Sequence, residues 1–454
     1  MTFNQTLWNA TVRHGTDVEI ANYILRSWAP EEKLAYHGAL YQYNTGEHTW
    51  DHRTNESCVK DILLLDGQQY AKPGDTTDAQ AKMTHVRMTS TRAKRVFEAA
   101  QLLTLDRTFA HEPEFFDDTP HGVLCNDVFL CVKDAQIDVR PCTSDDRQRV
   151  KLRIPYAHDA HAPMWTKALE DWFGSDEDGM RKRALLGEFV GAALFGLATR
   201  YQKVMFLYAA GGNGKSQLLE VVGELFPKQF LGAVSPQTWA NEYNRDRLSR
   251  LRLNIVNEIP SKTIDEGAYF KAIVTGDPVE ARQIYGIPYT YKPRAAHMFS
   301  TNDIPTSKDT SDGFWRRLLV LTMDKRFDGT AQEIPELARQ IIAEEMTGVL
   351  AWAVEGARRL LQQGSYTIPE SSRRAVEEWR GLSDPLGAWL KNRTTKTNQT
   401  HEMALGKNLF ADWLHWSGGE EDLSTQTAFS KALKKRLRNS KRFTNGVRYP
   451  VKLR

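Results

Sequence analysis

The chain has 454 residues, of which 41% are hydrophobic, so it is long enough for about two to four domains with packed cores. Its 60 Lys and Arg nearly balance 57 Asp and Glu, and the net charge of +3 says little about partners. It contains no run of eighteen apolar residues and no basic leader followed by an apolar core, so we expect a cytoplasmic protein without membrane segments. Its four cysteines lack C-x-x-C spacing, which indicates neither a zinc site nor a disulfide framework.

Residues 1–150 predict an α+β region of uncertain role. The aromatic-rich stretch 34–50 has strand character, residues 91–105 have helical spacing, and residues 121–132 are typical of two strands around a turn. A boundary is expected near 154–165, where proline and small polar residues interrupt the pattern. Residues 151–200 then carry apolar residues three and four apart, which favours a helical collar or oligomerisation region beside a core domain.

Residues 201–365 alternate short apolar runs with helical stretches, which favours an α/β domain with a mainly parallel sheet. The expected strands are 204–208, 252–259, 295–301 and 317–323, and helical spacing resumes over 333–364. Residues 366–454 form a last, basic unit, in which three helix candidates precede a terminal hairpin. This order is typical of a winged-helix DNA-binding module.

The stretch VMFLYAAGGNGKSQLLE has a strand, a glycine-rich turn and a helix in that order. Such a turn points successive N–H groups at phosphate oxygens, and the helix start adds its positive dipole end. Lys215 would reach the β and γ phosphates of ATP, and Ser216 would ligate Mg²⁺. Ala209 stands where the usual pattern has glycine, which is tolerable if its φ is negative. The predicted nucleotide-binding residues are Gly211, Gly212, Asn213, Gly214, Lys215, Ser216 and Gln217.

Three further strand boundaries carry polar side chains. Glu258 follows a buried strand, where a carboxylate would hold Mg²⁺ and position or deprotonate the attacking water. Asn302 follows the third strand and would position that water, with simple turn capping as the alternative. Arg316 directly precedes the fourth expected strand and Arg317 begins it. Either both are ordinary surface charge, or one of them stabilises the transition state in a neighbour's site within a ring.

The motifs GGNGKS, NIVNEIP, KAIVTGDPVEARQIYG, FSTNDIP and DGFWRR, in this order, resemble superfamily 3 helicases of the phage, plasmid and poxvirus primase-helicase type. The resemblance implies an AAA+-like P-loop ATPase core, ATP and Mg²⁺ as cofactors, and a homo-oligomer, expected to be a hexamer. It implies single-stranded and forked DNA as partners in a bacterial host cell, with a separate primase as a further partner. The catalytic residues that it carries over are Lys215, Glu258, Asn302, Arg316 and Arg317.

Between the second and third strands, this family has a hairpin that faces the central channel and grips single-stranded DNA. The corresponding residues 271–294 contain cations for phosphate contact and tyrosines for base stacking, although cross-strand packing of the tyrosines is the alternative. The predicted hairpin contacts are Lys271, Arg282, Tyr285, Tyr289 and Lys292, with Tyr291 and Arg294 beside them. In the C-terminal module the predicted DNA contacts are Lys434, Lys435 and Arg438.

The leading hypothesis is therefore an ATP-dependent DNA helicase for replication of a phage, plasmid or mobile element. The alternatives are an ATP-switched protein that assembles on DNA without processive unwinding and, less compatible with the hairpin and the basic tail, a small-molecule kinase. Priming by this chain is doubtful, because Asp117, Asp118 and Asp127 do not form the pair of acids one residue apart that a primase site needs.

Overall fold

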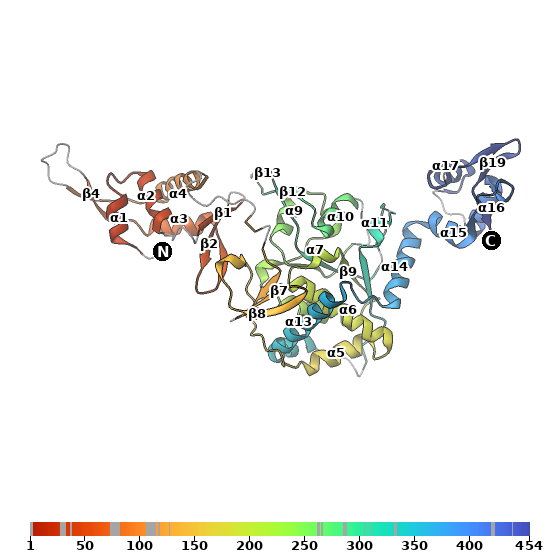
Figure 1. The fold of residues 1–454 in the computed structure, drawn as a ribbon, viewed down its shortest axis with the longest axis horizontal. Coiled ribbons are helices and arrows are strands. Elements are labelled where there is room, and N and C mark those ends of the chain that lie inside the picture. Colours follow the sequence, from red (N-terminus) through yellow and green to blue (C-terminus); the bar gives the residue numbers. More distant parts are fainter. Residues whose placement is uncertain are drawn as a thin grey trace.

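The computed structural model describes residues 3–27, 33–36, 39–72, 82–105, 115–116, 119–126, 128–260, 264, 267–284, 288–303, 305–309, 311–330, 334–418, 423–437 and 439–454. Figure 1 shows a small N-terminal part, a large central part, and a C-terminal part that is joined to the centre by helix α14 (Glu370–Ser383). No helix within these ranges is long and apolar enough to cross a bilayer.

The central part is built on a five-stranded sheet in which every neighbouring pair is parallel. In spatial order its strands are β10 (Leu231–Gly232), β11 (Leu253–Val256), β14 (Ala296–Thr301), β9 (Val204–Tyr208) and β15 (Leu318–Thr322). The α/β prediction and its four strands are confirmed, whereas β10 is too short to give a periodic pattern. Because the sheet is parallel, the carboxyl ends of β9, β14 and β11 meet at one edge.

The two faces of the sheet pack against two hydrophobic cores. Met205 and Leu207 of β9 face one core, and Phe206 faces the other, where its ring lies 4.7 Å from that of Trp379 on α14. The first core is covered by α5 (Pro163–Phe173), α6 (Glu177–Leu194), α8 (Lys215–Glu224), α12 (Leu337–Glu344) and α13 (Met346–Gln363). The second is covered by α9 (Glu242–Ser249), α10 (Gly267–Thr275), α11 (Asp312–Trp315) and α14.

Helices α6 and α13 approach each other closely because glycines line their contact. A Cβ on Gly356 would overlap the backbone of Gly187, and one on Gly191 would overlap the backbone at Ala357. The fully buried carboxylate of Glu188 also links the two helices. The predicted helical collar therefore does not stand apart from the sheet domain, since it shares one core with it.

The N-terminal part has its own core, formed by residues between Trp8 and Ala100. Its helices are α1 (Gln5–Thr11), α2 (Asp17–Ser27), α3 (Asn55–Leu63) and α4 (Ser90–Leu105), and its strands are β1 (Lys33–Tyr36), β2 (Ala39–Asn44), β3 (Thr49–Arg53), β4 (Gln69–Lys72) and β5 (Lys82–His85). The helix expected at 91–105 is α4, whereas α1–α3 were not expected.

The strand pair expected at 121–132 consists of β6 (Gly122–Leu124) and β7 (Phe129–Lys133), and β8 (Gln136–Arg140) extends it. Val123 and Leu130 belong to the core that covers the central sheet. The boundary between the N-terminal core and the central core therefore lies before β6 and not at residue 150. The antiparallel sheet of β6, β7 and β8 is part of the central unit.

The C-terminal part contains the three expected helices, α15 (Pro385–Arg393), α16 (Gly406–Ser417) and α17 (Gln426–Arg436), and the expected hairpin of β18 (Lys441–Phe443) and β19 (Gly446–Tyr449). Two further pairs, β17 (Ala404–Leu405) with β19 and β16 (Thr394–Lys396) with β20 (Val451–Leu453), complete it. The core of the C-terminal part begins at Leu386, whereas Trp379 of α14 packs in the second hydrophobic core of the central part. The separate core therefore starts about one helix later than the predicted boundary at 366.

Candidate nucleotide site and nucleic-acid interface

The glycine-rich turn joins β9 to α8, as the sequence predicts. Gly211, Gly212 and Gly214 have φ values of 105°, 66° and 82°, a region that favours glycine. Gly214 is the N-cap of α8, so Lys215 and Ser216 lie in the first turn, where unpaired N–H groups and the dipole attract an anion. Ala209 is buried and has no positive φ, so the condition for tolerating alanine there is met.

The ammonium group of Lys215 joins the ends of two strands. Its Nζ donates to the carbonyl oxygen of Ala209 and to Oδ1 of Asn302, each at 2.5 Å. Burial lowers the pKa of Lys215, and the nearby charge of Glu258 acts in the opposite direction. The predicted lysine, amide and carboxylate therefore gather at one edge of the sheet.

Glu258, Asn257 and Ser216 expose their side chains at this edge. Glu258 lies two residues after the end of β11, and the backbone N–H of Ile259 donates to the carbonyl oxygen of Ser300 in β14, which fixes the end of β11 against its neighbour. The carboxylate of Glu258 and the hydroxyl of Ser216 are hard oxygen donors of the kind that Mg²⁺ prefers. This donor set fits the predicted metal.

Contacts that the sequence did not predict hold the glycine-rich loop against α5 and the segment after β15. The side-chain amide of Asn213 donates to the carbonyl oxygen of Lys325. The backbone N–H of Phe327 donates to the carbonyl oxygen of Gly212 at 2.8 Å. The indole of Trp172 packs on Gly214, where it leaves no room for a Cβ. No local pattern signals these contacts, because they join the loop to α5 and to the segment after β15.

Two predicted loop residues are thus partly structural. The side chain of Asn213 is buried against that segment. Gln217 accepts a hydrogen bond from the N–H of Ala338 at 3.1 Å and donates to the carbonyl oxygen of Ile334 at 3.4 Å. The side chain of Gln217 therefore links α8 to the start of α12, while its backbone N–H lies in the first turn of α8 with those of Lys215 and Ser216.

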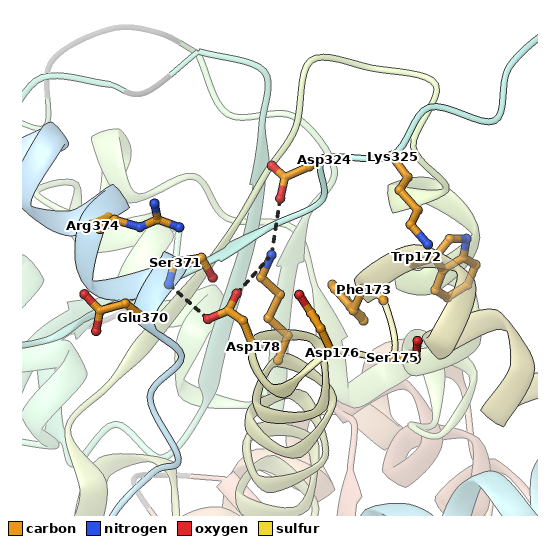
Figure 2. A pocket seen from close by; sticks show the side chains of 12 residues that line it. Trp172, Phe173, Ser175, Asp176, Asp178, Asp324, Lys325, Glu370, Ser371 and Arg374 are labelled. Atoms are coloured by element: carbon orange, nitrogen blue, oxygen red, sulfur yellow. Dashed lines mark hydrogen bonds and ion pairs between the residues drawn. The ribbon is translucent and has the colours of Figure 1, made fainter.

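A cavity of about 530 Å³ lies between the α5–α6 turn, the segment after β15 and the start of α14 (Figure 2). Lys182 of α6 lines the cavity, with Nζ 3.3 Å from Asp324 and 3.5 Å from Asp178. Asp178 also accepts from the N–H of Ser371 at 3.1 Å. These contacts link α6 to the segment after β15 and to the start of α14.

The two arginines before β15 differ in their surroundings. Arg316 is exposed, and its carbonyl oxygen accepts a hydrogen bond from Lys203. Arg317 is 7% exposed and donates to the carbonyl oxygen of Gly313, and burial followed by the charge of Arg316 lowers its pKa. Only Arg316 of the pair presents its guanidinium to solvent.

The expected hairpin is present as β12 (Val279–Arg282) and β13 (Pro288–Tyr291). Tyr289 donates to Asp246 at 2.7 Å and Tyr291 is 5% exposed, so both tyrosines hold the hairpin to the domain instead of presenting free faces for bases. Lys271 pairs with Asp309 at 2.8 Å, and Arg282 lies 3.6 Å from Glu242. For Tyr289 and Arg282, these contacts favour the alternative of a structural hairpin, whereas Lys271 lies on α10 and not on the hairpin.

The remaining predicted DNA contacts lie at two surfaces. Lys292 is exposed after β13, and Ile284 at the other side of the hairpin tip is 72% exposed. Lys434 and Lys435 are exposed on α17. Tyr285 and Arg438 lie outside the described residues, as do Asp117, Asp118 and Asp127.

One family model matches the part of the chain that contains this site. The model of a family of unknown function (DUF5906) matches residues 207–317, which contain the loop, Glu258, Asn302 and both arginines. A protein of Acanthamoeba polyphaga mimivirus named "Putative helicase L207/L206" is 27% identical over 128 residues, which are 27% of this chain and 13% of that protein. The present chain thus spans a small part of that relative.

Two solved structures of the NrS-1 C-terminal region, both in apo form, are also similar to the chain. One has 11% identity and a TM-score of 0.48, covering 96% of this chain and 98% of the other. The second has 11% identity and a TM-score of 0.42, covering 73% and 96% respectively.

Proposed function

We propose that the chain is an ATP-dependent DNA translocase of the superfamily 3 helicase type, with an AAA+-like core. The observation that carries the proposal is the meeting of Lys215, Asn302 and Glu258 at the ends of β9, β14 and β11, below a loop with three glycines at positive φ. A lysine, a polar amide and a carboxylate around a helix start are the groups that phosphoryl transfer from a nucleotide requires.

Each residue of the site has its own role in the proposed ATP hydrolysis. The backbone of the loop and Lys215 bind the phosphates, Ser216 and Glu258 hold Mg²⁺, and Asn302 with Glu258 orients a water. Bound Mg²⁺ supplies neutralisation of the charge that develops on the phosphates. Arg316, which is exposed, serves a neighbouring subunit in a homo-oligomeric ring, proposed to be a hexamer.

The DNA-binding part of the proposal rests on the exposed cations of α17, the hairpin tip and the name of the mimivirus relative. Single-stranded and forked DNA are the proposed substrates, in replication of a phage, plasmid or mobile element, with a separate primase as a candidate partner. The order of three helices and a hairpin supports a winged-helix role for residues 385–454.

Strand displacement on a fluorescently labelled fork, with ATP and Mg²⁺, tests this function. We expect activity for the wild-type chain and none for Lys215→Ala, and equal activity of the two would refute the proposal. ATPase measured with and without single-stranded DNA separates a motor from the alternative: several-fold stimulation indicates a translocase, whereas binding without turnover indicates an ATP-switched loading protein.

A further inference from the structure

The segment that follows β15 is fixed against the glycine-rich loop. The backbone N–H groups of Phe327 and Asp328 both donate to the carbonyl oxygen of Gly212, at 2.8 and 3.3 Å. On the other side of Arg326, the carbonyl oxygen of Lys325 accepts a hydrogen bond from the side chain of Asn213. Because its neighbours on both sides are bonded to the loop, the backbone of Arg326 has a set position beside the loop.

The side chain of Arg326 packs on the loop as well. A Cβ built on Gly212 would lie 3.3 Å from both Cγ and Nε of Arg326, and 2.7 Å from Cβ of Asp328. Nε is one of the three nitrogens of the guanidinium, so the cation begins in contact with a loop residue. Gly212 itself has a φ of 66°, so its lack of a side chain serves both the turn and this close approach.

The carboxylate that Arg326 pairs with can be exchanged. Nη2 of Arg326 lies 3.1 Å from Oδ2 of Asp328, and the two side chains are 72% and 60% exposed. An ion pair this exposed contributes little to stability. A phosphate group offers a guanidinium a bidentate contact with more negative charge, so a bound phosphate can replace Asp328 as the partner.

Arg326 would complement Lys215 from the other side of the loop. In the sheet, β9, which carries the loop, lies between β14 and β15. Lys215 is bonded to Asn302, which follows β14, whereas Arg326 follows β15. An anion at the start of α8 would therefore have one cation on the β14 side and a second on the β15 side, and two such charges neutralise more of a triphosphate than one.

We propose that Arg326 binds the phosphates of the nucleotide that is held by the loop of its own chain, in exchange for Asp328. The inference deepens the proposed function and rests on it. It gives the two exposed arginines different sites, since Arg316 is proposed to serve a neighbouring subunit. It also gives Asp328 a measurable effect: in the empty site this carboxylate competes with phosphate for Arg326 and lowers the affinity for nucleotide.

The test is titration of the full chain with a fluorescent ATP analogue and Mg²⁺, followed by displacement with inorganic tripolyphosphate. We expect Arg326→Gln to weaken the binding of both compounds about tenfold, the loss of one hydrogen-bonded contact to a charged group. We expect Asp328→Asn to strengthen both about threefold, because it removes an exposed competing partner. The matched controls are Arg373→Gln and Glu370→Gln, which break a similarly exposed pair at the start of α14 and should leave both affinities within about twofold.

The outcomes separate this inference from the proposed function. A wild-type chain that does not bind the analogue, or Lys215→Ala that binds it as tightly as the wild type, counts against the proposed function itself. Loss of binding in Lys215→Ala together with wild-type affinity in Arg326→Gln overturns only the role of Arg326. Weaker binding of the analogue but not of tripolyphosphate in Arg326→Gln also overturns it, because the contact would then be with the base or the sugar.

The Asp328→Asn variant keeps the test decisive if Arg326→Gln melts early, since it retains the arginine. An affinity for tripolyphosphate that stays the same or falls in Asp328→Asn overturns the proposal. In the double variant Arg326→Gln with Asp328→Asn, the gain from the asparagine should disappear, and a gain that persists would show that Asp328 repels the nucleotide without acting through Arg326.

Discussion

The ammonium nitrogen of Lys215 lies 2.5 Å from the side-chain oxygen of Asn302, 87 residues further along the chain. This bond joins the phosphate-loop helix to the end of β14 and places the amide where it can orient a water beside a phosphate. We predict that Asn302→Ala lowers the kcat of ATP hydrolysis by about 10²–10³-fold, the loss typical of removing one preorganised polar group. Steady-state ATPase assays check this.

The control for Asn302 is Asn257→Ala, because Asn257 is exposed at the same edge and precedes Glu258. We expect its turnover to stay within about twofold, as for surface changes in general. ATPase activity that survives Asn302→Ala unchanged would show that the bond to Lys215 is a structural one.

Two substitutions in the loop test whether glycine is needed at Gly214 and whether it is missed at Ala209. Gly214→Ala forces a residue with a side chain to φ of 82° and against the indole of Trp172, so we expect a cost of about 1–2 kcal/mol from the backbone alone and loss of nucleotide binding. Ala209→Gly should leave turnover within about twofold, since Ala209 has no positive φ. Titration with a fluorescent ATP analogue measures both, and a large gain from Ala209→Gly would show that the native loop is impaired.

The sequence predicted the parts of this site that depend on local pattern. The strand, the glycines and the helix start are adjacent in the chain, and parallel strands bring Glu258 and Asn302 to the same edge. Trp172 on the loop could not be predicted, because its contact is a tertiary one with no periodicity. The pairing of Lys271 with Asp309 was missed for the same reason, and a cation in a basic segment was assigned to DNA although a carboxylate neutralises it.

The link between α6 and α13 predicts a large effect on stability. Glu188 is fully buried and accepts hydrogen bonds from Arg359 at 2.8 Å and from the N–H and hydroxyl of Thr367 at 2.7 Å each. We expect Glu188→Ala to lower the free energy of unfolding by about 1–3 kcal/mol, because the N–H and hydroxyl of Thr367 lose their acceptor, whereas the partly exposed guanidinium of Arg359 can be solvated by water. Urea unfolding followed by tryptophan fluorescence measures the change.

A matched control for Glu188 lies on α13 itself. Glu355 pairs with Arg358, but its side chain is 57% exposed, so Glu355→Ala should cost less than about 1 kcal/mol. Similar losses in the two variants would mean that burial of Glu188 adds nothing to the ion pair.

The contrast between Arg316 and Arg317 predicts opposite consequences for two neighbouring residues. Arg317 is buried and bonded to Gly313, so Arg317→Ala should lower the melting temperature and reduce every activity together. Arg316 is exposed, so Arg316→Ala should keep the wild-type melting temperature and nucleotide affinity while ATP turnover falls by about 10³-fold or more, as for other arginines that stabilise this transition state.

Mixing experiments decide whether Arg316 acts across a subunit interface. A chain with Arg316→Ala keeps its own Lys215 and Glu258, and a chain with Lys215→Ala keeps its own Arg316. If Arg316 serves a neighbour's site, mixed oligomers of the two inactive variants contain some sites with both groups and regain part of the ATPase activity. If Arg316 acts within its own chain, no site in the mixture has both groups, and the mixture stays as inactive as its components.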